Sequence, residues 1–164
     1  MDAIRYEKLA DHEDAGRKYF IDHWLSDTLI VSSGDYHFAD LNGLIALEPD
    51  DTVVGLITFA IHGNAMAVVS LNSVRNGRGI GKRLLALAEN RARMIGLTKM
   101  DVSVMNDNLQ ALGFFQRQGY RLTKIIRGSI DIARTRKPEI PLIGADEIPL
   151  HDEVLMSKLL VQPK

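Results

Sequence analysis

Residues 76–85 read NGRGIGKRLL, and glycines occupy three alternate positions directly before a run with the composition of a helix. A turn rich in glycine can point its backbone N–H groups inward, and the start of a helix adds the positive end of its dipole. From Arg75 to Arg93 there are six basic residues and one acidic residue, although the whole chain has 20 Lys and Arg against 21 Asp and Glu. The stretch therefore predicts a phosphate-binding loop, although glycine spacing alone also suits a plain turn before a solvated basic helix.

Two well-known phosphate loops do not fit these residues. A Walker loop has the pattern G-x-x-x-x-G-K-[ST]. Here Asn76 stands at the first glycine position, and Arg83 follows Lys82 where a Ser or Thr would bind magnesium. A Rossmann loop needs G-x-G-x-x-G near the start of a parallel sheet, whereas this spacing is G-x-G-x-G and four predicted strands precede it. Both kinds of nucleotide loop are therefore excluded.

The composition is that of an ordinary globular protein. The chain has 164 residues, of which 46% are hydrophobic and 25% charged, and this length predicts a single domain over residues 1–164. Because there is no cysteine, disulfides, thiolate metal sites and a Cys nucleophile are excluded, and no metal site is expected. The charged N-terminus does not resemble a signal peptide, and no apolar run approaches the roughly 20 residues of a membrane span. We therefore expect a cytoplasmic protein that binds neither membrane nor nucleic acid.

Apolar periodicity divides the chain into strands and helices. Asp11 or Asp14 is placed to cap the first helix, and Asn106 or Asn108 to cap the third. The predicted strands are 3–9, 44–47, 53–61, 65–70, 100–104, 120–126 and 153–160; the helices run from Asp11 or Asp14 to about Leu25, from 80 to 95 and from Asn106 or Asn108 to Gly119; and loops are expected at 26–42 and 128–149.

This order of elements predicts a mixed α+β fold. The three strands between residues 44 and 70 are separated by EPDD and HGN, which suit hairpin turns. The front half of the sheet is therefore antiparallel, and a strand–helix–strand unit follows it. The glycine-rich stretch stands where the last hairpin strand leads into the second helix.

Two motifs resemble those of the GNAT-type N-acetyltransferases. The family's acetyl-CoA signature is [QR]-x-x-G-x-[GA] at a strand-to-helix junction, and Gly79 and Gly81 match both small positions, whereas Asn76 departs from the first. A second family pattern, N-x-x-A-x-x-x-Y-x-x-x-G-[FY], resembles NLQALGFFQRQGY at 108–120. The order of elements also resembles that of the family over nearly the whole chain.

The resemblance implies a fold, an activity and a set of binding residues. It implies a central, mostly antiparallel sheet of about seven strands, splayed after the fourth strand and flanked by helices, with acetyl-CoA in the notch. The enzyme would move an acetyl group from acetyl-CoA to a primary amine of a small molecule or protein by direct attack, and the resemblance also allows a homodimer, although no residue specifies an interface. Main-chain groups of Val69 and Leu71 would hold the pantetheine arm, amides of Gly77 to Lys82 the pyrophosphate, and Asn108 would lie beside the pantetheine. The implied cofactor-binding positions are Val69, Leu71, Asn76, Gly77, Arg78, Gly79, Ile80, Gly81, Lys82, Asn108 and Phe115.

The resemblance also implies catalytic groups. The backbone N–H of Leu71 would stabilise the oxyanion. Phe115 stands where the family usually has the tyrosine that protonates the departing thiolate, and a water or another tyrosine such as Tyr36 could act as the donor instead. Loss of a general acid costs about 10²–10⁴ in rate, and a thiolate with a pKa of about 8.5 is a tolerable leaving group. His62 is a candidate base because histidine titrates in the useful range, with Asp35 and His37 as alternatives.

Simpler interpretations stay open at these positions. Phe115 also suits the core, His62 also suits an exposed turn, and the fourth strand, AMAVVSLNSV, contains no carboxylate to act as a base. An acyl-CoA-binding module with weak or absent catalysis is therefore the alternative to an enzyme. A nucleic-acid binder is disfavoured, because the basic helix lacks interleaved aromatic residues.

Overall fold

The computed structural model describes residues 3–74 and 78–160. These residues form two compact units, each described by itself. Unit 1 contains residues 3–29, 36–74, 78–100 and 160, and unit 2 contains residues 30–35 and 101–159. Within the described ranges, no helix is long and apolar enough to cross a membrane.

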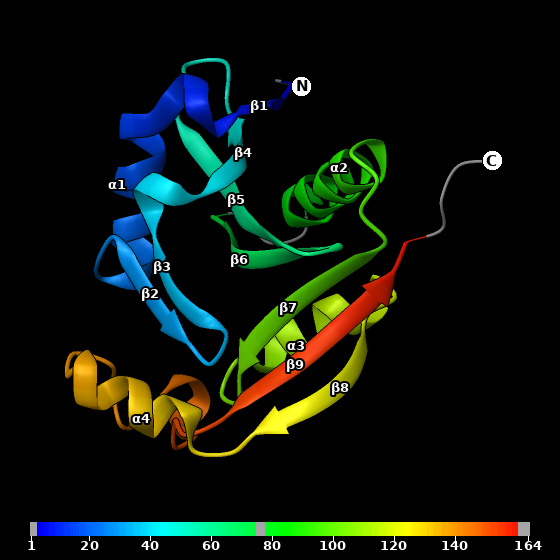
Figure 1. Cartoon of the computed structure of the whole chain (residues 1–164). Helices are drawn as coiled ribbons and strands as arrows, with labels where there is room; N and C mark the ends of the chain where they lie inside the picture. The colour runs from blue at the N-terminus through cyan, green and yellow to red at the C-terminus, as the bar shows by residue number, and fades with distance from the viewer. Residues whose placement is uncertain (1–2, 75–77, 161–164) are drawn as a thin grey trace. The chain divides into compact units, whose positions relative to one another are not determined.

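The fold has seven sheet strands, which are ordered β1-β4-β5-β6 in unit 1 and β7-β9-β8 along unit 2 (Figure 1). The pairs β1/β4, β4/β5, β5/β6 and β8/β9 are antiparallel, which confirms the mostly antiparallel α+β sheet. The splay expected after the fourth of the predicted strands concerns the relation between the units and stays a prediction. The strands are β1 (Arg5–Lys8), β4 (Asn42–Leu47), β5 (Val53–His62), β6 (Ala65–Ser73), β7 (Lys99–Met105), β8 (Arg121–Ile126) and β9 (Glu153–Leu159).

In unit 1, two helices lie on opposite sides of β4 and β5, α1 (Glu13–Trp24) on one side and α2 (Ile80–Met94) on the other (Figure 1). Gly55 of β5 lets α2 approach the sheet, since a Cβ there would lie 2.7 Å from Ile80 Cγ2 and 3.0 Å from Leu84 Cδ1. The buried side of α2 is apolar apart from one carboxylate. Its buried residues recur at intervals of three and four, as predicted. Its buried members are Ile80, Leu84, Leu85, Ala88, Glu89 and Ala92.

Unit 2 contains β9, β8 and most of β7, together with two helices, α3 (Leu109–Arg117) and α4 (Ser129–Arg136). The Asn108 side chain accepts a hydrogen bond from the Ala111 N–H at 3.1 Å, so the cap expected for the third helix is confirmed at this residue. The cap expected for the first helix is wrong, because His12 precedes α1 without a side-chain cap and Asp11 lies in the 3₁₀ helix η1 (Leu9–His12).

Two segments expected as loops contain regular structure. Residues 26–42 form the strands β2 (Thr28–Val31) and β3 (Gly34–His37) and the 3₁₀ helix η2 (Phe38–Asp40), because Leu29, Tyr36 and Phe38 bury their side chains. The segment 128–149 contains α4 and the 3₁₀ helix η3 (Ala145–Glu147). In α4, Ile130 and Ala133 are buried three residues apart. Two apolar residues among charged ones are too short a pattern to predict a helix from the sequence.

Replacing Tyr19 by Phe is expected to leave stability unchanged or raise it by up to about 1 kcal/mol. The Tyr19 hydroxyl is buried and has no hydrogen-bond partner within the described ranges. Burial raises the pKa of Tyr19 from 10.0 to about 12. Because the folded state then holds this proton more tightly than the unfolded state, stability present below pH 10 is lost as the pH rises toward 12. Urea denaturation across this range should show a smaller alkaline loss in Tyr19→Phe; an equal loss would contradict the assignment.

Candidate active site

The glycine-rich stretch lies where β6 ends and α2 begins, as predicted. Gly79 precedes α2 with φ 73° and ψ 14°, a left-handed conformation that glycine adopts without strain. A Cβ at Gly79 would meet nothing within 4 Å, so the space in front of this residue is open. Of the expected loop positions, Asn76 and Gly77 lie outside the described residues. The described part of the junction has the room and the backbone turn that a bound phosphate requires.

The side chains at this junction make it electropositive. The first turn of α2 contains no acidic residue, and Lys82 and Arg83 are exposed on it. Burial raises the pKa of Tyr6, and the positive charges of Arg83 and Arg78 partly offset this rise. Arg78 also pairs at 3.7 Å with Glu48, the residue that follows β4. The potential here favours an anion.

A β-bulge interrupts the pairing of β5 with β6 at Val69. Thr58 pairs with Ser70 and Phe59 pairs with Val68, so Val69 is an extra residue in β6. A bulge leaves backbone groups out of the ladder and redirects the strand. The structure therefore places irregular backbone at one of the two positions expected to hold the pantetheine arm. Leu71, the other position, pairs with Ile57.

Polar side chains follow the bulge along β6. Ser70 Oγ and Thr58 Oγ1 are buried and 2.6 Å apart. Two residues further on, Asn72 Oδ1 accepts a hydrogen bond from Trp24 Nε1 at 3.2 Å. Sequence reasoning noticed that this strand contains no carboxylate, but it missed the contact of Asn72 with the end of α1, because 48 residues separate the two partners.

Tyr36 and His62, two separate candidates in the sequence, lie in direct contact within unit 1. The Tyr36 hydroxyl is 2.9 Å from His62 Nε2, and the ring centroids are 5.9 Å apart at an interplanar angle of 64°. Tyr36 is buried, whereas His62 is exposed at the end of β5. A phenol hydrogen-bonded to an imidazole can pass a proton in either direction, so the pair has the composition of an acid–base group.

The alternative bases have other partners. Asp35 forms two hydrogen bonds with the Arg136 guanidinium, one of them 3.0 Å long, and this contact raises the pKa of Arg136. His37 Nδ1 lies 3.1 Å from Thr28 Oγ1. A carboxylate held by an arginine is a poor proton acceptor, so Asp35 is disfavoured as the base.

Asn108 and Phe115 both lie in unit 2. Asn108 is exposed at the start of α3, where its side-chain oxygen caps the helix. Phe115 is buried, and its ring stacks edge-on against Phe114 and Tyr120 at centroid distances of 5.2 and 5.3 Å. These contacts explain Phe115 as a core residue, and the roles of Asn108 and Phe115 toward the cofactor stay predictions.

Glu153 is a carboxylate that sequence reasoning missed. It is fully buried at the start of β9 and accepts hydrogen bonds from the Ser32 N–H at 2.7 Å, Ser32 Oγ at 2.9 Å and Ser103 Oγ at 2.6 Å. All three partners belong to unit 2, and they hold the turn between β2 and β3 against β7 and β9. Nothing local marks this residue, because its partners are 121 and 50 residues away in sequence.

No group of three or more His, Asp or Glu side chains gathers as a metal site would require, among the residues placed by the structure.

Comparison with known proteins gives consistent matches. The model of the acetyltransferase (GNAT) family matches residues 6–120. The uncharacterized protein YxbD of Bacillus subtilis (strain 168) is 38% identical over 148 residues, which cover 90% of this chain and 93% of that protein. The IAA acetyltransferase from Bacillus cereus ATCC 14579 is similar in structure, with a TM-score of 0.70, 18% identity and coverage of 96% of this chain and 100% of that chain. A GNAT family acetyltransferase from Elizabethkingia anophelis with acetyl-CoA bound has a TM-score of 0.68, 16% identity and coverage of 98% and 100%. The two solved structures share the fold of this chain.

Proposed function

Because the chain belongs to the acetyltransferase (GNAT) family, it is an acetyltransferase that uses acetyl-CoA, and we propose that its acceptor is a primary amine of a small molecule or protein. The observation that carries the proposal is the junction at Gly79, where a bulged strand leads through a left-handed glycine into a helix without acidic residues in its first turn. Amides of residues 77–82 would hold the pyrophosphate, with Arg78, Ile80, Gly81 and Lys82 forming the described part of this cradle. Val69 and Leu71 would offer backbone groups to the pantetheine arm, and Asn108 and Phe115 would border it.

The proposed reaction is direct transfer. The neutral amine nitrogen attacks the thioester carbonyl carbon, an N–C bond forms, the C–S bond breaks, and the amine proton replaces the acetyl group on the coenzyme A sulfur. The backbone N–H of Leu71 would stabilise the negative charge that develops on the carbonyl oxygen.

We assign the proton transfers to the Tyr36–His62 pair. His62 pairs with Ala65 across the hairpin. Ala65 lies four residues before the bulge at Val69, so the two positions are roughly 13 Å apart along β6. A proton would therefore pass between the amine and the pair through ordered water rather than by direct contact. Tyr36 supplies the hydroxyl that the family's usual tyrosine position lacks in this chain, where Phe115 stands.

The proposal is tested by thermal unfolding with and without acetyl-CoA, together with release of free coenzyme A thiol across a panel of amines. Acetyl-CoA at about 100 times its dissociation constant should stabilise the protein by about 2.7 kcal/mol. Stabilisation with amine-dependent thiol release would support transfer to an amine. Stabilisation without release for any amine would instead favour the acyl-CoA-binding module.

Replacing Gly79 by Ala is expected to weaken acetyl-CoA binding by about tenfold or more, since the methyl group disfavours φ 73° and redirects the amides of the cradle. Gly63→Ala is the matched control, because Gly63 has φ 58° in the hairpin turn and equally open surroundings. Both variants should lose about 1 kcal/mol of stability. Calorimetric titration with acetyl-CoA separates them, and an equal loss of affinity in Gly63→Ala would show that strain rather than the cradle is responsible.

Three wider assignments are part of the same proposal. We infer that residues 1–164 act as one acetyltransferase domain, that the enzyme works in the cytoplasm, and that it forms a homodimer. Light scattering of the full chain with and without acetyl-CoA measures the last of these directly.

A further inference from the structure

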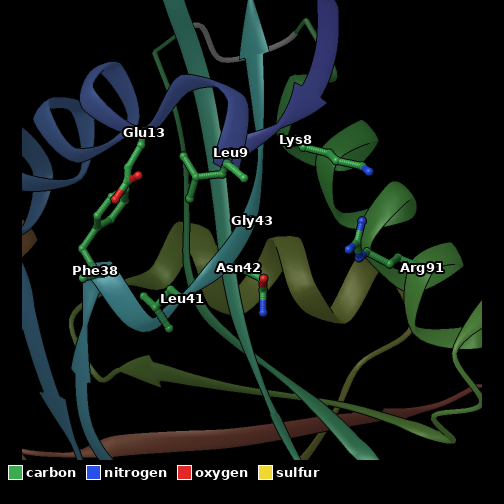
Figure 2. A pocket seen from close by; sticks show the side chains of 10 residues that line it. Lys8, Leu9, Glu13, Phe38, Leu41, Asn42, Gly43 and Arg91 are labelled. Carbon is green, nitrogen blue, oxygen red and sulfur yellow. The ribbon is translucent and has the colours of Figure 1, made fainter.

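Unit 1 contains a pocket of about 180 Å³ that does not involve the glycine-rich junction. It lies between η1, the start of β4 and the last turns of α2 (Figure 2). The only lining residue from α2 is Arg91, which is eleven residues beyond Ile80 and therefore about 16 Å along the helix from its start. The pocket is thus separate from the proposed phosphate cradle.

The floor of this pocket is apolar and fixed. Leu9 and Phe38 are 3% and 2% exposed. Gly43 and Gly16 let Leu9 fit closely, since a Cβ at either position would lie 2.9 Å or less from a Leu9 methyl carbon. The Phe38 ring packs against Phe20 at 5.4 Å. A floor held this tightly exists before any ligand binds.

The rim of the pocket carries basic and amide groups on one side. Figure 2 shows the nitrogen ends of Lys8 and Arg91 pointing toward the same region, and the Asn42 carboxamide also lines the pocket. All three side chains are exposed, and within the described ranges neither cation forms an ion pair or a side-chain hydrogen bond. Two positive charges that line one pocket repel each other unless an anion lies between them, and arginine binds a carboxylate through two parallel hydrogen bonds.

The opposite side of the rim restricts the ligand. Glu13 lines that side, and its own charge is paired with Arg17 at 3.7 Å. A second negative charge at the far end of a ligand would be repelled there. We propose that the pocket binds a small organic monocarboxylate, with its carboxylate between Lys8 and Arg91 and its short apolar body on Leu9 and Phe38. This site does not depend on the proposed acetyl transfer.

The test is titration of the ¹⁵N-labelled full chain with isovalerate, followed by amide NMR shifts. Saturable shifts are expected at Leu9, Ala10, Asn42 and Gly43, with Gly79 unaffected. The neutral isostere isovaleramide should bind about tenfold more weakly or worse, because a charge-assisted hydrogen bond is lost. Shifts that rise linearly without saturation, or equal binding of the amide, would overturn the proposal.

A matched pair of variants tests whether the charge of Arg91 binds the carboxylate. Arg91→Gln should weaken isovalerate binding by about tenfold or more, whereas Arg93→Gln should change it by less than about twofold. Arg93 lies on the same helix but does not line the pocket, and it bonds Asn90 at 3.0 Å instead. Equal losses in the two variants would contradict a specific site. Inorganic phosphate tests the apolar floor, because equal affinity for phosphate would show that the ligand class is wrong.

Discussion

Tyr36→Phe should lower kcat for acetyl transfer by about 10²-fold while leaving the affinity for acetyl-CoA unchanged. The variant keeps the buried ring and removes only the hydroxyl that lies 2.9 Å from His62 Nε2. His62→Gln should lower kcat to a similar degree, because either change interrupts the same proton path. Steady-state rates of coenzyme A release from pH 5 to 9 measure both effects.

Matched variants separate chemistry from packing. Tyr19→Phe removes the same atom from a buried tyrosine of unit 1 whose hydroxyl has no partner, so kcat should not change. The double variant of Tyr36 and His62 should be no slower than either single variant, as expected for groups that act as one unit. If both single variants keep full kcat across the pH range, the proton leaves by another route and the pair is structural.

The fold could be predicted wherever local pattern and burial agree. Strands β4, β5 and β6 alternate with turns of recognisable composition, and α2 buries positions three and four residues apart. The β2–β3 hairpin could not be found in this way. Its two strands have four residues each. Glu153 bonds its turn and Arg136 bonds Asp35 of β3, and both partners are distant in sequence. Its stability is a property of tertiary contacts, which a window of neighbouring residues does not contain.

In the candidate site, too, local features could be predicted from the sequence and contacts between distant residues could not. The glycine-rich junction is a local feature, because left-handed backbone at Gly79 and a basic first turn are both properties of consecutive residues. The Tyr36–His62 contact joins residues 26 apart, so composition suggested each residue singly but not the pair. The pocket beside Arg91 is formed by three segments that are distant in sequence, and no sequence pattern predicts that they come together.

Glu153 shows most clearly what distant contacts contribute to unit 2. A carboxylate with no solvent exposure is costly unless its oxygens are hydrogen-bonded, and here three donors supply those bonds. Two of the donors come from Ser32, so the same residue that satisfies the buried charge also fixes the β2–β3 turn. Removing the side chain would empty a fully buried position and leave the Ser32 N–H and two hydroxyl groups without this acceptor.

Glu153→Ala is therefore expected to destabilise the protein by roughly 3–5 kcal/mol, a large fraction of the 5–15 kcal/mol typical of a domain. Glu153→Gln keeps the size and one acceptor oxygen, so its loss should be smaller, about 1–2 kcal/mol. The control is Glu139→Ala, which removes an exposed carboxylate of the same unit and should change stability by less than about 0.5 kcal/mol. Urea denaturation gives these values, and hydrogen exchange at the Ser32 amide reports the turn itself. A loss below about 1 kcal/mol in Glu153→Ala, with Ser32 still protected, would mean that water replaces the carboxylate and that the turn is held by other contacts.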